Sequence, residues 1–251
     1  MSGHSKWANI KHRKGAQDAK RSKIFTRIIK ELTVAVKEGG SEQETNPRLR
    51  TAVQNAKGAN MPKDTIERTI KKASGTGGTS YEEVTFEGYA SNGVAVFAEC
   101  TTDNNNRTIA NIRAIFSKYG GNLGTNGSLE FIFDRKGVFT ITYENIKIDL
   151  EELEMELIDG GLEKLEKEKA IILIYTDFAD FSVMQKKLGE LEIEIQSAEL
   201  QRIPNTTKIL DVEKSKSVLK MIDKFEEDDD VQNVFHNLEM TDELMQTFEE
   251  K

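Results

Sequence analysis

The hydrophobic period of this chain changes near residue 75, and no other feature constrains its fold as strongly. Before Gly75 the apolar residues recur every three or four positions, which is the spacing of amphipathic helices. After Tyr81 they alternate with polar residues, which is the spacing of half-buried strands. The stretch 75–79, Gly-Thr-Gly-Gly-Thr, lies between the two patterns and has the composition of a flexible linker. The sequence therefore predicts a helical domain followed by α/β structure.

Three short helices are expected in the first part. The first, at about 17–37, separates its apolar residues from its cations on opposite arcs of the helix. The apolar arc holds Ile24, Phe25, Ile28, Ile29, Leu32 and Val36, and the cationic arc holds Lys20, Lys23, Arg27, Lys30 and Lys37. Helix ends and starts are marked by Gly39-Gly40, Asn46-Pro47, Gly58 and Met61-Pro62. Because each apolar stripe is thin, the helices are expected to bury one another as a small bundle.

The second part contains a β-α-β-β-α-β pattern, the ferredoxin-like order. Its members are a strand at 138–143, a helix at 149–158, strands at 162–167 and 170–175, a helix at 178–188 and a strand at 191–200. The flanking pieces each read β-α-β: 94–100, 107–119 and 129–133 before it, and 207–210, 213–225 and 231–237 after it. The simplest arrangement inserts one α/β sandwich into another. We therefore predict an α+β fold of three domains: a three-helix bundle at 1–78, a discontinuous α/β sandwich at 79–136 and 206–251, and an inserted ferredoxin-like sandwich at 137–205.

Charge is divided unevenly along the chain. Residues 1–78 contain 17 Lys and Arg against 7 Asp and Glu, a net charge of +10. The remainder contains 18 bases and 36 acids, a net charge of −18, so the whole chain carries −8. The basic end is suited to hold a polyanion, whereas the acidic body would repel one. Contact with nucleic acid is therefore expected at one end of the molecule, and the acidic α/β domains are candidates to receive a protein partner.

The predicted nucleic-acid-binding residues are mostly cations of this basic end. They are His4, Lys6, Trp7, Lys11, His12, Arg13, Lys14, Lys20, Lys23, Arg27, Lys30 and Arg107. Lys and Arg would neutralise phosphates and release counterions, although the same face would also serve to keep the chain in solution. Trp7 is suited either to stack on a base or to anchor the first turn. For His4 and His12 we expect hydrogen bonds to phosphate or backbone, since nearby cysteines and metal-ligand spacing are both lacking.

Two polar stretches of the α/β part each allow two interpretations. Asp103, Asn104, Asn106 and Arg107 lie on a strand-to-helix loop, where they would either cap the helix or contact RNA or protein, with Arg107 as the phosphate ligand. The acidic run 226–230 follows a helix, where the dipole disfavours negative charge. Such a run is typically solvated, and the alternative is that it binds a cation or a basic partner.

Other function classes find little support in the sequence. It contains no recognisable Ser-His-Asp or Cys-His arrangement and no phosphate-binding G-x-x-x-x-G-K-[ST] motif, so we predict neither an enzyme nor a cofactor. No apolar run approaches the roughly 20 residues of a membrane helix, and no secretory signal is visible. Cys100 is the only cysteine, which fits a cytoplasmic protein and a small buried residue at a strand end.

Several stretches resemble the YebC/PmpR family. They are Gly3–Lys14, Gln17–Arg21, Asn46–Arg50, Ala59–Arg68, Tyr81–Glu83, Glu87–Tyr89, Thr102–Asn104, Asn106–Thr108, Phe116–Lys118, Gly120–Gly124, Phe133–Gly137 and Asp230–Val234. The resemblance covers essentially the whole chain and is most specific over the first 75 residues. The chain departs from the family pattern at Ser2 and at the turn 90–93, and the inserted domain, including 151–168, matches only loosely.

The resemblance implies three domains, with one α/β domain inserted in the other. It also implies a function in gene expression, because members are described as probable transcriptional regulators that bind DNA and as ribosome-associated translation factors. Mitochondrial relatives include a translational activator of cytochrome c oxidase subunit I. We therefore expect a cytoplasmic regulator that binds DNA through its basic N-terminal domain. The alternatives are a translational activator that contacts ribosomal or transfer RNA, and a non-catalytic protein–protein adaptor.

Overall fold

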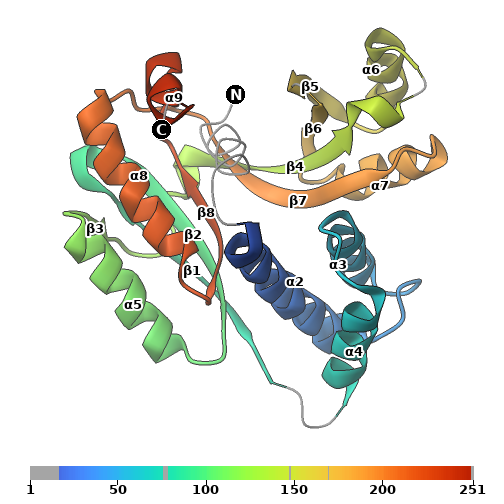
Figure 1. Ribbon diagram of the computed structural model, residues 1–251, viewed down its shortest axis with the longest axis horizontal. Helices are drawn as coiled ribbons and strands as arrows, with labels where there is room; N and C mark the ends of the chain where they lie inside the picture. The colour runs from blue at the N-terminus through green and yellow to red at the C-terminus, as the bar shows by residue number, and fades with distance from the viewer. Residues whose placement is uncertain (1–16, 76–78, 147, 169, 250–251) are drawn as a thin grey trace. The chain divides into compact units, whose positions relative to one another are not determined.

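The structure, a computed structural model, describes residues 17–75, 79–146, 148–168 and 170–249. Its internal contacts divide the chain into two compact units. Unit 1 combines residues 1–27, 79–134 and 203–251, and unit 2 combines residues 28–78 and 135–202. The described residues form two four-stranded sheets with helices, which confirms the predicted α+β class (Figure 1). The three-domain boundaries at 78/79, 136/137 and 205/206 remain a prediction.

The helices of the first part begin and end close to where the sequence predicts. They are α2 (Gln17–Gly39), α3 (Pro47–Gly58) and α4 (Lys63–Ser74). Asn46 caps α3, because its Oδ1 accepts a hydrogen bond from the backbone N–H of Leu49 at 3.0 Å. The Asn46 Nδ2 donates to the carbonyl oxygens of Ala35 at 2.7 Å and Gly40 at 2.8 Å. One buried amide therefore ends α2 and starts α3.

The sheet of unit 2 has the ferredoxin-like order that the sequence predicts. Its elements are β4 (Phe133–Thr142), α6 (Leu150–Ile158), β5 (Leu162–Glu168), β6 (Ile171–Asp177), α7 (Phe181–Glu190) and β7 (Ile195–Pro204). The strand order is β5-β6-β4-β7, and β6 pairs antiparallel with both β4 and β5. Helices α6 and α7 share one core with the sheet, which includes Phe139, Leu157 and Met184.

Helix α3 is joined to the edge strand β7 by side-chain amides and by close backbone approach. The Asn55 side chain donates to the carbonyl oxygen of Ala198 at 2.9 Å and accepts from its N–H at 2.8 Å. These two bonds occupy backbone groups that an edge strand otherwise leaves unpaired. A methyl group placed on Gly58 would lie 1.8 Å from the carbonyl oxygen of Gln196. Only glycine therefore allows the end of α3 to lie this close to β7.

The sheet of unit 1 has the strand order β3-β1-β2-β8. The elements of the unit beyond α2 are β1 (Glu82–Tyr89), β2 (Ala95–Thr102), α5 (Asn105–Lys118), β3 (Asn122–Leu123), α8 (Val212–Glu226), β8 (Val231–His236) and α9 (Asp242–Glu249). Helices α5 and α8 share a core with the sheet, in which the rings of Phe116 and Phe225 meet edge to face at 5.0 Å. Cys100 is buried in β2, as predicted.

Two strands predicted from the sequence are wrong. The stretch 129–133 alternates like a strand, but Glu130–Ile132 is a 3₁₀ turn. The buried Glu87 carboxylate accepts the N–H groups of Gly127 at 2.7 Å and Leu129 at 2.6 Å, so this loop satisfies its backbone without a strand partner. The stretch 207–210 forms only one isolated bridge, between Lys208 and Leu238. One edge of the sheet is instead formed by the two-residue strand β3, in a stretch where the sequence pattern predicted no strand.

We predict that Gly58→Ala lowers the free energy of unfolding by about 2 kcal/mol, because the added methyl overlaps the backbone of β7. The matched control is Gly189→Ala in α7, where the space around the new methyl is open and alanine favours the helix by up to about 1 kcal/mol. Urea denaturation of the two variants checks the difference. Equal stabilities would contradict the close α3–β7 packing.

Candidate nucleic-acid interface

The predicted nucleic-acid-binding residues fall into two groups in the structure. His4, Lys6, Trp7, Lys11, His12, Arg13 and Lys14 lie outside the described residues, and so does the side chain of Lys20. Lys23, Arg27, Lys30 and Arg107 are described. All four are buried or have partners within the chain that the sequence did not indicate.

Lys23 and Arg27 lie on the first half of α2 and bind the carboxyl end of α8. Lys23 donates to the carbonyl oxygen of Glu227 and forms an ion pair with Asp229. Arg27 donates from Nη2 to the carbonyl oxygen of Glu226 at 3.0 Å and from Nε to that of Val231 at 3.2 Å. The last carbonyls of a helix lack partners within it and carry partial negative charge, so cations stabilise this end. These two cations therefore serve a contact inside unit 1.

Lys30 does not face solvent, which corrects its place on the predicted cationic arc of α2. Its relative exposure is 7%, and the following stretch of α2 from Leu32 to Val36 is buried throughout. The predicted separation of cations and apolar residues on opposite arcs is therefore wrong at Lys30 and over 32–36, whereas Lys37, one turn further on, is exposed as predicted. The long methylene stem of lysine suits the buried position of Lys30 while its ammonium group reaches polar partners.

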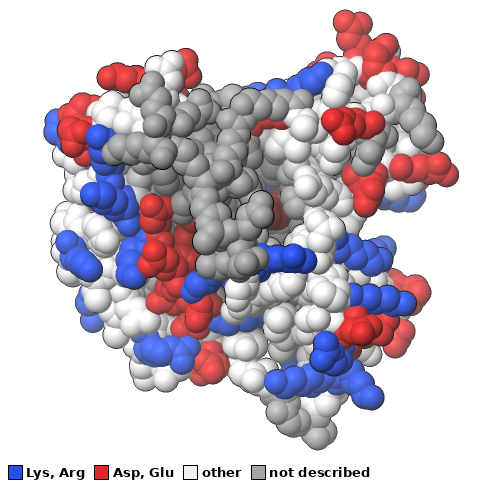
Figure 2. All heavy atoms as spheres, viewed as in Figure 1, with Lys and Arg blue, Asp and Glu red and all other residues white. Residues whose placement is uncertain are grey.

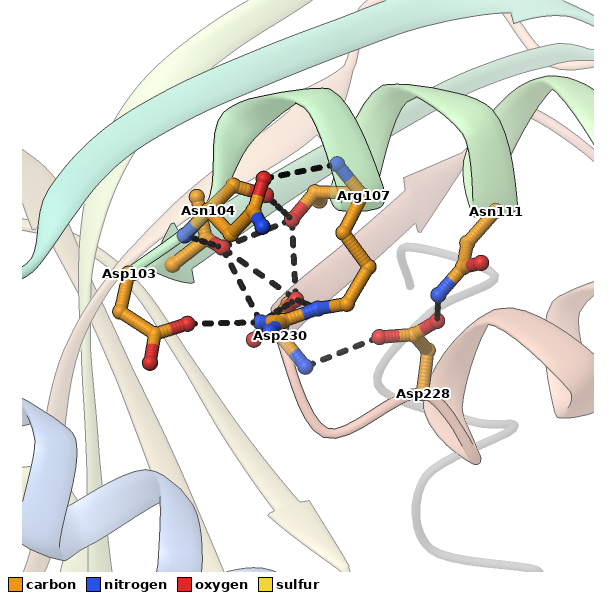
Figure 3. A network of polar contacts seen from close by, with 8 residues as sticks. Asp103, Asn104, Arg107, Asn111, Asp228 and Asp230 are labelled. Carbon is orange, nitrogen blue, oxygen red and sulfur yellow. Dashed lines mark hydrogen bonds and ion pairs between the residues drawn. The ribbon is translucent and has the colours of Figure 1, made fainter.

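Asp230 is the centre of a polar network that joins β2, α5 and β8 (Figure 3). Its Oδ2 accepts from Arg107 Nη2 at 2.7 Å, Arg107 Nε at 3.2 Å and Thr108 Oγ1 at 2.9 Å. Arg107 Nη2 also donates to Asp103 Oδ1 at 2.8 Å. The buried Asp230 carboxylate, with a relative exposure of 5%, is thereby paired and hydrogen-bonded, as a charge in the interior requires.

The strand-to-helix loop supplies the cap of α5. Asn104 Oδ1 accepts from the backbone N–H of Arg107 at 3.1 Å, and Thr102 Oγ1 accepts from the N–H of Asn104 at 2.9 Å. The structure thus gives this loop the capping function that the sequence analysis left open beside nucleic-acid contact. Hydrogen bonding to Asp230, and then to Asp103, raises the pKa of the Arg107 guanidinium above its usual value. Arg107 is therefore firmly charged, but its charge is balanced within unit 1.

From the sequence, the acidic run 226–230 was expected to be solvated. In the structure, most of its residues instead accept hydrogen bonds or form ion pairs within the chain. Besides Lys23, Arg27 and Arg107, the run binds Asn111, whose Nδ2 donates to Asp228 Oδ2 at 2.9 Å. Tyr81 belongs to the same neighbourhood: burial first, and then the charge of Asp103, raise the pKa of its hydroxyl. The run receives its basic partners from its own chain.

Exposed cations are concentrated on α3 and α4, a feature the sequence analysis did not single out. Residues 47–74 contain seven Lys and Arg against two acids. The exposed ones are Arg50, Lys57, Lys63, Arg68, Lys71 and Lys72. The ammonium groups of Lys57, Lys71 and Lys72 form no ion pair or hydrogen bond with another described group. Figure 2 shows Lys and Arg gathered over these helices, at the lower right of the view.

Metal and membrane functions find no structural support within the described part of the chain. The described residues contain no group of three or more His, Cys, Asp and Glu that could hold a metal ion. Among the same residues, every helix is too short or too polar to cross a membrane. The exposed cations of α3 and α4 are therefore the described feature with the clearest binding chemistry.

Comparisons with known proteins give matches along nearly the whole chain. Residues 5–76 match the TACO1/YebC protein N-terminal domain, and residues 81–238 match the TACO1/YebC second and third domain. A protein of Amoebophilus asiaticus is 52% identical over 240 residues, which cover 95% of this chain and 98% of that one. A protein of Syntrophotalea carbinolica is 51% identical over 246 residues, which cover 98% of both chains. Each carries the name probable transcriptional regulatory protein.

A solved structure has the same fold. The crystal structure of a conserved hypothetical protein, Aq1575, from Aquifex aeolicus matches with a TM-score of 0.79 and 41% sequence identity. The match covers 88% of this chain and 91% of that one. The agreement therefore extends over helices and both sheets.

We predict that Asp230→Ala lowers the free energy of unfolding by about 2–4 kcal/mol, because it leaves several donors without their buried acceptor. The matched control is Asp229→Ala, whose side chain is 72% exposed and whose loss costs less than about 1 kcal/mol. Chemical denaturation measures both. Similar losses for the two variants would show that Asp230 is not the centre of the network.

Proposed function

Because the chain belongs to the TACO1/YebC family, we propose that it is a regulator of gene expression that binds DNA through its basic N-terminal helical domain. The names of its relatives support the regulatory role. Binding of this kind requires no catalytic group and no cofactor. The observation that carries the proposal is the set of exposed, unbalanced cations on α3 and α4, in a part of the chain with a net charge of +10.

The contacts of α2 narrow the residues that we assign to phosphate. Lys23 and Arg27 are bound to the end of α8, Lys30 is buried and Arg107 is paired with Asp230. For any of these four residues to bind a phosphate, an existing contact or its burial would have to be lost. The ammonium groups of Lys57, Lys71 and Lys72 can bind a phosphate without such a loss. We therefore assign phosphate contact to these three lysines, together with the predicted segment 4–14.

A ribosomal or transfer RNA is the second candidate polymer. The observation in its favour is the net charge of −18 on residues 79–251, which opposes wrapping of a long DNA around the molecule. An RNA that lies beside basic proteins could contact the basic domain at one end of this chain. The acidic remainder of the chain would then face those basic proteins and not the RNA. Affinities for duplex DNA and for ribosomal RNA, measured side by side, separate the two polymers.

We predict that changing Lys57, Lys71 and Lys72 together to Glu weakens nucleic-acid binding about 100-fold at low salt, because three phosphate contacts become repulsive. The slope of log affinity against log salt falls by roughly 3 for duplex DNA. Fluorescence anisotropy with labelled DNA and RNA across a salt series measures both quantities.

The matched control reverses the same number of exposed lysines elsewhere: Lys186, Lys214 and Lys220. This variant has the same net charge, and we expect it to bind with little change in affinity. Equal losses in the two triple variants would show a general charge effect and not a defined site. A flat salt response of the unmodified protein would favour the protein–protein adaptor instead.

A further inference from the structure

Helix α6 carries apolar side chains on two opposite faces. Leu153 and Leu157 have a relative exposure of 0% and belong to the core of the β4–β7 sandwich. Met155 is 65% exposed and Ile158 is 63% exposed. Two positions along a helix correspond to a rotation of about 200°, so Met155 points away from both buried leucines. Ile158 follows Met155 by three residues and neighbours it on the outer side.

Only some of the acidic residues of α6 stabilise the helix. Asp149 caps it, accepting the N–H of Glu152 at 2.8 Å, and acids in the first turn are favoured by the dipole. Glu154 lies at the middle of the helix and Asp159 directly follows its last residue, where the dipole disfavours negative charge; both are exposed. No Lys or Arg lies between positions 149 and 161, so the helix has no cation of its own; the cation nearest in effect is Lys187 of α7, whose pKa the charge of Asp159 helps to raise.

One acid of the second half does have a structural function. Glu156 accepts from Lys187 of α7 at 2.8 Å, which joins the two helices of the sandwich. Hydrogen bonding to Glu156 is also the main cause that raises the pKa of the Lys187 ammonium. Glu156 faces α7 and is therefore separate from the outer side, which consists of Glu151, Glu154, Met155, Ile158 and Asp159. We call these five residues the α6 outer face.

We propose that the α6 outer face is a docking surface for a basic amphipathic segment of a protein partner. Met155 and Ile158 would be covered by apolar side chains of the partner at helical spacing, and the three acids would meet its Lys or Arg side chains. Figure 2 shows acidic side chains gathered over α6, at the upper right of the view. Charge complementarity thus selects the occupant, since a surface with this rim attracts cations and repels polyanions.

The same charges argue against other occupants. Nucleic acid and anionic lipid both present phosphates, which Glu151, Glu154 and Asp159 would repel. The face is also separate from the lysines of α3 and α4 to which we assign phosphate contact. The inference therefore does not rest on the proposed function, and each stands or fails in its own assay.

The test uses the full-length chain and a fluorescein-labelled Leu/Lys peptide whose leucines recur at helical spacing. Fluorescence anisotropy at physiological salt gives its affinity. We expect Met155→Ser with Ile158→Ser to weaken binding about tenfold, because the apolar part of the contact is lost while every charge remains. Glu151→Gln with Glu154→Gln should weaken it too and reduce its salt dependence. A peptide of the same composition with scrambled order should bind at least tenfold more weakly than the amphipathic one.

The matched control is Phe131→Ser with Ile209→Ser, which removes two apolar side chains of unit 1 that are each 72% exposed. It should bind the peptide like the unmodified chain. The Met155/Ile158 variant should keep its thermal melt and its affinity for nucleic acid, since both side chains are exposed.

Four results would overturn the proposal. The first is unchanged peptide binding by the Met155/Ile158 variant, and the second is equal binding of the scrambled and amphipathic peptides. The third is a lowered melting temperature of the Met155/Ile158 variant, which would show that these two side chains stabilise the fold. The fourth is self-association of the unmodified chain, measured by sedimentation, that the same variant abolishes. That result would assign the face to a second copy of the chain.

Discussion

The neutralisation of negative charge at the carboxyl end of α8 is the interaction on which unit 1 depends. Backbone carbonyls that lack a partner within the helix and acidic side chains converge there, and nearby cations stabilise both. Arg27 and Lys23 supply them from α2, and Arg107 supplies one from α5. Because Asp230 is buried, its pairing is a condition for joining β2, α5 and β8.

This arrangement divides the basic residues of the chain by function. Lys23 and Arg27 of α2 and Arg107 of α5 hold unit 1 together, whereas Lys57, Lys71 and Lys72 of α3 and α4 are exposed and available to an external polyanion. The uneven distribution explains how a chain with a net charge of −8 can present a basic surface: residues 1–78 carry +10, whereas the excess of acids lies in residues 79–251. The acidic α6 outer face is the opposite excess, and it suits a basic partner.

Local patterns in the sequence predicted most of the fold. The Asn46-Pro47 start of α3 and the β-α-β-β-α-β order both follow from rules that act within a few residues. The errors came from contacts that no local pattern contains. Glu87 replaces a strand partner for residues 127–129, and Arg27 meets Val231 across 204 residues of chain. Amphipathicity also overstated the solvent face of α2, because Lys30 lies where the helix is enclosed.

The most direct test of this division is lysine acetylation footprinting of the full chain, with and without bound nucleic acid, read by mass spectrometry. The account predicts protection of Lys57, Lys71 and Lys72, and of the predicted Lys11 and Lys14, with Lys23 unchanged because its partner is Asp229 in both states. Protection of Lys23 without protection of the α3 and α4 lysines would contradict it.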